Sequence, residues 1–221
     1  MSEGSARRAI VTAGPTLEAI DPVRFLSNRS SGRQGYALAE ALAARGFAVT
    51  LVTGPTALDT PPGVTRVDVE SARQMLAAVE AALPADVFAG VAAVADWRPA
   101  ETHALKLKVD KDGFTHLPLA PNPDILHTVA SLGPDTRPSL VIGFAAETHE
   151  VEANAIAKRA RKGCDWIVAN DVSGDVMGGA ENAVLIVTGD GVETLERAPK
   201  REIADAVARR VADLFPHPGS G

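Results

Sequence analysis

Apolar residues follow two different spacings along this chain, and the two spacings alternate. Continuous apolar runs at 9–14 and 48–52 are typical of strands buried on both faces of a parallel sheet. The segments 36–42 and 151–162 place apolar residues three or four positions apart, which indicates amphipathic helices. Strands that alternate with helices form βαβ units, so we predict an α/β protein with a Rossmann-like three-layer fold and a mainly parallel sheet.

The alternation continues to the C-terminus. Further strands are predicted at 64–69, 86–95, 140–146 and 166–170, and a closing helix at 199–215. Two apolar runs, 183–187 and 192–195, are joined by Thr188-Gly189-Asp190-Gly191, which is typical of a β-hairpin. Because a hairpin pairs its strands antiparallel, the sheet is predicted to be mixed at this edge.

Capping residues mark the start of two further helices. Ser71 followed by Gln74 is the pattern of a capping box. Asn122-Pro123-Asp124 predicts an N-cap, a proline at the first helical position and an acid in the first turn, and Gly133 is expected to end that helix.

The composition is that of an ordinary globular protein, with 46% apolar and 23% charged residues among 221. We expect a single domain, 1–221, with flexible ends at 1–7 and 216–221. A net charge of -6 argues against a nucleic acid or an anionic membrane as partner, because both require a basic surface. Nothing resembles a signal peptide or a membrane-spanning run, which favours a cytoplasmic location.

Cysteine and histidine usage gives no sign of a disulfide or a zinc site. The single cysteine, Cys164, excludes an internal disulfide and fits a reducing compartment. It follows Gly163, which is expected to end a helix, and we interpret it as a small apolar core residue in preference to a nucleophile. The five histidines show no ligand spacing.

A polar, glycine-containing loop at 27–35, Ser-Asn-Arg-Ser-Ser-Gly-Arg-Gln-Gly, lies between the first strand and the first helix. The free N–H groups and the dipole of a first helical turn favour an anion, and glycines let it approach the backbone, so the loop is predicted to bind phosphate. Two alternatives stay open. In the first, the glycines only start the helix. In the second, the site binds a dinucleotide, which requires G-x-G-x-x-G and an acidic residue after the strand at 48–52, and this chain has neither.

Loops from several strands are expected to meet at one edge of the sheet, because the carboxyl ends of parallel strands lie together in a doubly wound fold. These loops begin at Gly14, Thr53, Asp96, Glu147 and Asn170. The polar loop at 27–35 is predicted to share this edge.

Two groups of lysines lie near that edge. The long connection 96–122 contains Lys106, Lys108 and Lys111, and it is either a flap that closes over a polyphosphate or a solvated surface hairpin. On the helix at 151–162, Lys158 and Lys162 project on the same side, beside Arg161. They either serve the site or only interact favourably with the helix dipole.

The motifs that carry a family resemblance run in order across nearly the whole chain. They are IVTAGPT at 10–16, DPVR at 21–24, SN-x-SSG at 27–32, AAVAD at 92–96, K-x-K at 106–108, NPDI at 122–125, GFAAET at 143–148 and ANDV at 169–172. Together they resemble phosphopantothenoylcysteine synthetase, an enzyme of coenzyme A biosynthesis. In bacteria it is commonly the carboxy-terminal half of a protein whose amino-terminal half is a flavin-dependent decarboxylase.

The resemblance implies a CTP-dependent ligase. The carboxylate of 4'-phosphopantothenate attacks the α-phosphate of CTP, which gives an acyl-cytidylate and pyrophosphate. The amine of cysteine then displaces CMP and forms the amide. The resemblance also implies Mg²⁺ with the nucleotide, a homodimer, no flavin on this chain, and a fused or separate decarboxylase as partner.

Roles for individual residues follow from the same resemblance. Asn28 and Lys106 are the implied catalytic residues, and Arg24, Asn28 and Ala93 are the implied substrate-binding residues, with Arg24 acting from the neighbouring subunit. The implied nucleotide-binding residues are Ala92, Asp96, Lys106, Pro123, Asp124, Ile125, Leu126, Phe144, Lys158 and Lys162. No side chain is assigned to a metal. The flap pattern of the family is Lys-x-Lys-Lys, whereas this chain has Val109 at the last position and Lys111 as the nearest replacement.

Two other functions stay open from the residues. An NAD(P)-dependent reductase is disfavoured by the missing fingerprint. A non-catalytic nucleotide-binding module would be indicated by loss of Asn28 or Lys106, and both are present. The choice of CTP over ATP depends on a few contacts that sequence spacing does not determine.

Overall fold

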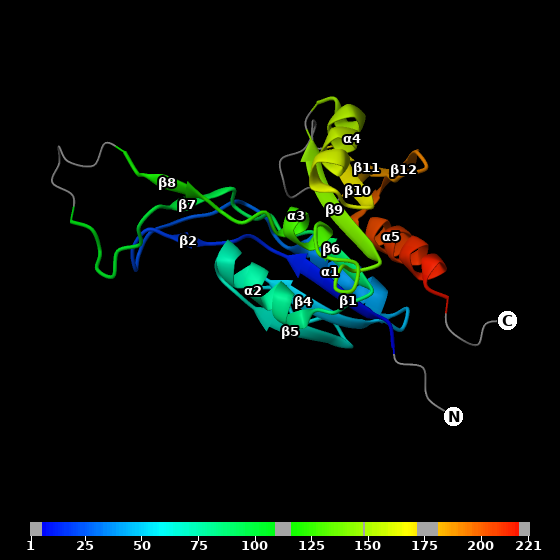
Figure 1. The fold of residues 1–221 in the computed structure, drawn as a ribbon, viewed down its shortest axis with the longest axis horizontal. Helices are drawn as coiled ribbons and strands as arrows, with labels where there is room; N and C mark the ends of the chain where they lie inside the picture. Colours follow the sequence, from blue (N-terminus) through cyan, green and yellow to red (C-terminus); the bar gives the residue numbers. More distant parts are fainter. Residues whose placement is uncertain (1–5, 109–115, 148, 172–180, 217–221) are drawn as a thin grey trace.

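A computed structural model describes residues 6–108, 116–147, 149–171 and 181–216 of the chain. An eight-stranded sheet forms its centre, in the order β12-β11-β10-β9-β6-β1-β4-β5 (Figure 1). The strands of this sheet are β1 (Arg8–Ala13), β4 (Ala48–Thr53), β5 (Val64–Asp68), β6 (Val87–Gly90), β9 (Leu140–Glu147), β10 (Trp166–Asp171), β11 (Glu181–Val187) and β12 (Val192–Pro199). Neighbours from β5 to β10 are parallel, and the pairs β10–β11 and β11–β12 are antiparallel. The predicted mixed sheet is confirmed.

Helices cover both faces of this sheet and complete the three layers (Figure 1). One face carries α1 (Arg33–Ala43) and α5 (Lys200–Leu214), and the other carries α2 (Ala72–Ala82), α3 (Ile125–Ala130) and α4 (Val151–Lys162). In β1, Val11 belongs to the core beneath α1 and α5, whereas Ile10 belongs to the core beneath α2, α3 and α4. Side chains alternate between the faces of a strand, so a continuous apolar run supplies both cores.

Several local predictions are confirmed. The helix α4 has the predicted bounds, and Gly163 ends it with a φ of 69°. Ser71 and Gln74 make both hydrogen bonds of a capping box at the start of α2. Cys164 is buried in the core beside α4, as expected for a small apolar residue.

The strand predicted at 86–95 is wrong in its second half. The strand β6 ends at Gly90, and the following residues form a loop. Two N–H groups of this loop donate to the Thr12 hydroxyl at 3.2 Å, and a third donates to the Thr16 hydroxyl at 3.0 Å. Because buried hydroxyls replace the sheet hydrogen bonds here, an apolar sequence pattern does not reveal where the strand ends.

The helix after this loop also begins later than predicted. Asp124, and not Asn122, is the N-cap of α3, because its Oδ1 accepts a hydrogen bond from the His127 N–H at 3.1 Å. Asn122 uses its side chain in the loop before the helix instead. The helix ends at Ala130, before the predicted Gly133.

Two short hairpins extend from the carboxyl edge of the sheet and were not predicted as strands. They pair β2 (Glu18–Ala19) with β3 (Phe25–Leu26), and β7 (Trp97–Pro99) with β8 (Leu119–Pro121). In Figure 1, β2, β7 and β8 run together away from the helices, and the His103 N–H donates to the Ile20 carbonyl oxygen at 3.0 Å. We call the described residues of 18–26 and 97–121 the arm.

Candidate functional site

The candidate site lies at the carboxyl ends of β1, β6 and β9. The loop 91–96, which follows β6, forms its floor, and the segment that follows β1 holds this loop in place. The Ala93 N–H donates to the Gly14 carbonyl oxygen at 2.9 Å, in addition to the bonds made by the two threonine hydroxyls. Thr12 is 2% exposed and Thr16 0%, so the supporting hydroxyls are shielded from water. The floor is therefore fixed before a ligand arrives.

Asn28, an implied catalytic residue, lies directly on this floor. Its Nδ2 donates to the Ala93 carbonyl oxygen at 2.6 Å, and its Oδ1 accepts the Ser30 N–H at 3.0 Å. The Ser27 hydroxyl donates to the Thr16 carbonyl oxygen at 2.9 Å and fixes the start of the polar loop. The fold thus brings together Asn28 and Ala93, two residues with implied substrate contacts.

The polar loop leads into a helix, as predicted, but α1 begins at Arg33 and so includes the last three residues of the predicted loop. In the described part of the chain no side chain caps this helix. Its first N–H groups are therefore open to an anion. Gly32 has a φ of 75°, a conformation that L side chains rarely adopt. The expectation that both glycines admit an anion needs a correction at Gly35. A Cβ at this position would lie 2.6 Å from the Ala13 Cβ, so Gly35 allows α1 to pack closely on β1.

The turn before α3 closes the other side of the floor. Asn122 donates its backbone N–H to the Asp96 carbonyl oxygen and its Nδ2 to the Ala95 carbonyl oxygen, both at 2.8 Å. Its Oδ1 is buried and has no hydrogen-bond partner among the residues that the structure describes. A buried acceptor of this kind costs free energy unless a water or a ligand donates to it. The side chain of Asp96 is exposed at the same place.

Asp124 and Lys162 connect α3 to α4. In addition to capping α3, Asp124 forms an ion pair with Lys162 through Oδ2. Burial acts to raise the pKa of Asp124, but the hydrogen bonds from Lys162 and the His127 N–H outweigh it, so the pKa is lowered. Asp124 is therefore a carboxylate at neutral pH and holds the Lys162 ammonium beside the start of α3.

Lys158 lies one helical turn before Lys162, and its Nζ donates to the Phe144 carbonyl oxygen at 2.9 Å. Burial lowers the pKa of Lys158, Glu147 opposes this shift, and the cations Lys162 and Arg161 add to it. A desolvated ammonium beside other cations is stabilised by an anion. The pair of lysines on α4 is thus suited to a polyphosphate.

Ile125 and Leu126 turn their side chains towards the sheet. Ile125 is 5% exposed and belongs to the core. Leu126 packs against two glycines, and a Cβ on Gly143 would lie 2.5 Å from the Leu126 Cδ2. These two side chains therefore hold α3, and with it the turn at 122–124, against the sheet.

Lys106 and Arg24 lie on the arm and make no hydrogen bond to this floor. Lys106 is exposed and forms no hydrogen bond or ion pair with a described residue. Arg24, with an implied role across a subunit boundary, forms an ion pair with Asp21 of its own chain and donates to the Leu107 carbonyl oxygen at 3.3 Å. Val109 and Lys111, which the resemblance places on a flap, lie outside the described residues.

The described side chains do not form a binding site for a resident metal ion. Among the described residues, no three His, Cys, Asp or Glu side chains gather closely enough to bind one. In the same ranges, every helix is too short or too polar to span a membrane.

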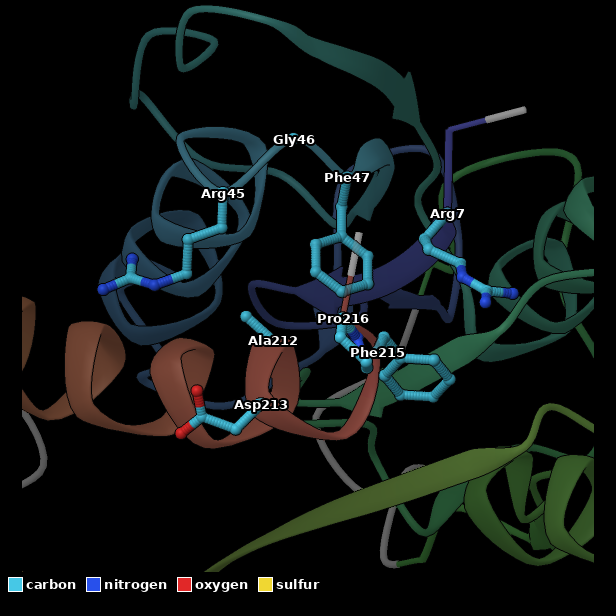
Figure 2. Close-up of a pocket in the computed structure, with 8 residues that line it drawn as sticks. All are labelled: Arg7, Arg45, Gly46, Phe47, Ala212, Asp213, Phe215 and Pro216. Carbon is cyan, nitrogen blue, oxygen red and sulfur yellow. The ribbon is translucent and has the colours of Figure 1, made fainter. Parts of the chain in front are cut away.

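A separate cavity of about 270 Å³ lies near the start of β1 and the end of α5 (Figure 2). Phe47 and Phe215 line it between Arg7 and Arg45, as Figure 2 shows. Both arginines already form ion pairs with aspartates, at 3.3 and 2.7 Å. None of the implied site residues lines this cavity, so we do not include it in the candidate site.

Three supporting residues lie within the quoted motifs, but sequence reasoning gave them no role. They are Thr12, Thr16 and Asp21, all of which are buried. For Asp21 a signal was available, because an aspartate before a proline favours a turn in which the carboxylate accepts nearby N–H groups. The Thr12 hydroxyl within an apolar strand also indicates a side chain that accepts nearby N–H groups, but less specifically.

Comparisons with known proteins agree with this architecture. Residues 5–215 match the sequence profile of the DNA/pantothenate metabolism flavoprotein C-terminal domain. The chain is 45% identical over 211 residues to the coenzyme A biosynthesis bifunctional protein CoaBC of Vibrio parahaemolyticus, a match that covers 93% of this chain and 52% of that protein. The chain thus spans about half the length of this relative.

Two solved structures resemble the fold over most of its length. The crystal structure of the C-terminal domain of CoaBC is 40% identical, with a TM-score of 0.79 and coverage of 95% of both chains. A Cab2 mutant in complex with phosphopantothenate-cysteine is 16% identical, with a TM-score of 0.73 and coverage of 95% of this chain and 87% of that chain. The second likeness concerns the fold alone.

Proposed function

This chain belongs to the family of DNA/pantothenate metabolism flavoprotein C-terminal domains, and on that premise we propose that it joins cysteine to 4'-phosphopantothenate. The proposed reaction uses CTP. The substrate carboxylate forms an acyl-cytidylate and releases pyrophosphate, and the amine of cysteine then displaces CMP. The product amide is an intermediate of coenzyme A biosynthesis.

The hydrogen bond between Asn28 and Ala93 is the main structural support for this proposal. It places a neutral amide on a floor that buried hydroxyls hold in position. The Asn28 Nδ2 has two hydrogens, and the described residues accept only one, so the second is available to the acyl-cytidylate. Fixed neutral donors stabilise developing charge without adding a charge that a carboxylate or phosphate would repel.

The nucleotide is proposed to lie along the turn before α3 and the cationic face of α4. Lys158 and Lys162 would contact its phosphates. The Asn122 Oδ1, which has no partner among the described residues, would accept a hydrogen bond from the nucleotide or a bound water. Because the described residues do not form a metal site, we place Mg²⁺ on the phosphates of the nucleotide. We expect no flavin on this chain.

We also propose that the active form is a homodimer and that a decarboxylase is its partner in the pathway. Five large apolar side chains are exposed on the arm: Val23, Phe25, Trp97, Leu105 and Leu119. Exposed apolar groups on a projecting arm favour its burial against a second copy. Arg24 lies among them, which supports its proposed contact with substrate at a subunit boundary.

Pyrophosphate release tests the proposed function. The assay combines the protein and Mg²⁺ with phosphopantothenate and with CTP, ATP, GTP or UTP in turn, with and without cysteine. We expect release with CTP that depends on phosphopantothenate, and CMP formation that also requires cysteine. Release without phosphopantothenate, or no release with any nucleotide, contradicts the proposal.

Two other functions predict different results. An NAD(P)-dependent reductase would be stabilised thermally by NADH and not by CTP. A non-catalytic nucleotide-binding module would be stabilised by CTP and would release no pyrophosphate.

A further inference from the structure

Asp21 is a buried carboxylate at the turn between β2 and β3, and it is not among the residues with an implied catalytic or binding role. Its side chain has 0% exposure, although it lies on the projecting arm. Its Oδ1 accepts the N–H groups of Val23 and Arg24 at 2.8 and 2.9 Å. These bonds close the local turn and require only one carboxylate oxygen.

The second oxygen of Asp21 connects the turn to the flap. Oδ2 accepts the Leu107 N–H at 3.2 Å and the Arg24 Nε at 2.9 Å, together with a bond from the Arg24 Nη2. The Nη2 also donates to the Leu107 carbonyl oxygen at 3.3 Å. Both backbone polar groups of Leu107 are therefore held by one ion pair, whose carboxylate is buried.

This attachment fixes the segment that carries the flap lysines. Lys106 and Lys108 flank Leu107, and both side chains are exposed. Neither lysine makes a hydrogen bond or ion pair with a described residue, so the position of their backbone is set through Leu107. Two further bonds connect the same segment, 102–108, to β2 and its turn. The Thr102 hydroxyl donates to the Ala19 carbonyl oxygen, and the His103 N–H donates to the Ile20 carbonyl oxygen.

The ionised state of Asp21 is essential to this arrangement. Its carboxylate accepts five hydrogen bonds, and the Arg24 guanidinium beside it holds its pKa well below the usual range. A charged group without exposure is stable only when it is paired in this way. Because the side chain is inaccessible, it cannot contact a substrate directly.

We propose that Asp21 is a positioning residue that, through Leu107, places Lys106 for the reaction. The inference rests on the proposed ligase function and deepens it. Arg24 then has two roles, because its Nε and Nη2 hold Asp21 and the flap while its side chain remains 39% exposed. An anion bound to the exposed edge of Arg24 would contact the same unit that positions Lys106.

Two variants test the proposal in the full chain. Asp21→Asn removes the charge and retains the size. Leu107→Pro removes the Leu107 N–H and leaves the Asp21–Arg24 pair in place. If Asp21→Asn does not fold, this second variant still tests the proposal. Asp205→Asn is the matched control, because Asp205 also pairs with arginines but lies on α5, away from the arm.

Amide hydrogen exchange provides a readout that does not depend on activity. In Asp21→Asn we expect exchange at Leu107 to accelerate by roughly tenfold or more, since its acceptor is weakened. In the ligase assay, both variants should lower kcat by roughly tenfold while KM for the nucleotide stays within about threefold. The control should match the parent in both measurements.

Unchanged exchange at Leu107 in Asp21→Asn would overturn the proposal, whether or not ligase activity is found. Turnover within about threefold of the parent in both variants would also overturn it. A parent protein that releases no pyrophosphate would refute the proposed function and the catalytic role of Lys106 together, while the exchange result would still decide whether Asp21 holds the flap.

Discussion

The side-chain amide of Asn28 donates to the carbonyl oxygen of Ala93 at 2.6 Å, across 65 positions of sequence. The bond joins the polar loop to the floor of the site, so one side chain both supports the floor and faces the proposed intermediate.

Asn28→Asp should lower ligase activity by roughly a hundredfold, or about 3 kcal/mol, because it removes a donor and places a carboxylate against the Ala93 oxygen and the phosphate. Gln74→Glu is the control, because it makes the same change of amide to carboxylate at the start of α2. There the Gln74 Oε1 only accepts hydrogen bonds, and a carboxylate oxygen can accept them too. Activity is measured as pyrophosphate release with CTP. A decrease at Asn28 of less than about threefold would remove this residue from the site.

Lys106→Gln should lower turnover by roughly tenfold or more, because a lysine on a flap contacts the triphosphate only when the flap is in place. The free energy of unfolding should change by less than about 0.5 kcal/mol, since the side chain is exposed. Lys111→Gln is expected to have a smaller effect. Equal and minor effects of the Lys106, Lys108 and Lys111 variants would indicate a solvated hairpin without a catalytic role.

The protein should be a homodimer whose interface includes the arm. Phe25→Glu is expected to give a monomer, because it places a charge in an apolar interface. Leu214→Glu is the matched control, since both side chains are 55% exposed and Leu214 lies at the end of α5. Light scattering measures the mass. An active monomer of the parent at assay concentration would contradict this prediction.

Nucleotide binding should be coupled to protonation of Lys158. Its pKa is lowered by burial, so between that lowered value and the ordinary lysine value the free protein carries a neutral amine. A bound triphosphate favours the ammonium, so binding takes up a proton and affinity decreases as pH rises through this window.

Calorimetry at several pH values below the ordinary lysine pKa, in two buffers of different ionisation enthalpy, measures this proton uptake. Lys158→Met should abolish the uptake and raise the nucleotide KM. Equal uptake in the variant and the parent would assign the proton to another group.

Gly143→Ala should destabilise the fold by about 1–2 kcal/mol, because its Cβ would lie 2.5 Å from Leu126 and 2.7 Å from Ile167 in a packed core. The displaced Leu126 should move α3 and weaken nucleotide binding as well. Gly133→Ala is the control, since its Cβ would meet nothing within 4 Å. Urea denaturation compares the two variants, and equal midpoints would contradict the proposed packing.

The sequence alone determined features whose causes lie within a few residues of each other. The bounds of α4 follow from its apolar spacing and from Gly163, and the capping box at Ser71 needs only Gln74. The hairpin of β11 and β12 follows from two apolar runs and a glycine-containing turn. The family resemblance added the assignment of Asn28 and Lys106, and the matching profile over 5–215 confirmed the family.

The tertiary structure decided features that depend on partners distant in sequence. The end of β6 is set by the Thr12 hydroxyl, 79 positions away from Val91, and Leu107 is held by Asp21, 86 positions away. The lowered pKa of Lys158 likewise depends on burial that only the packed α4 provides. Propensity and periodicity report local preferences, whereas these contacts form only when the sheet brings the carboxyl ends of its strands together. The sequence therefore named candidate site residues but did not show which of them lie side by side.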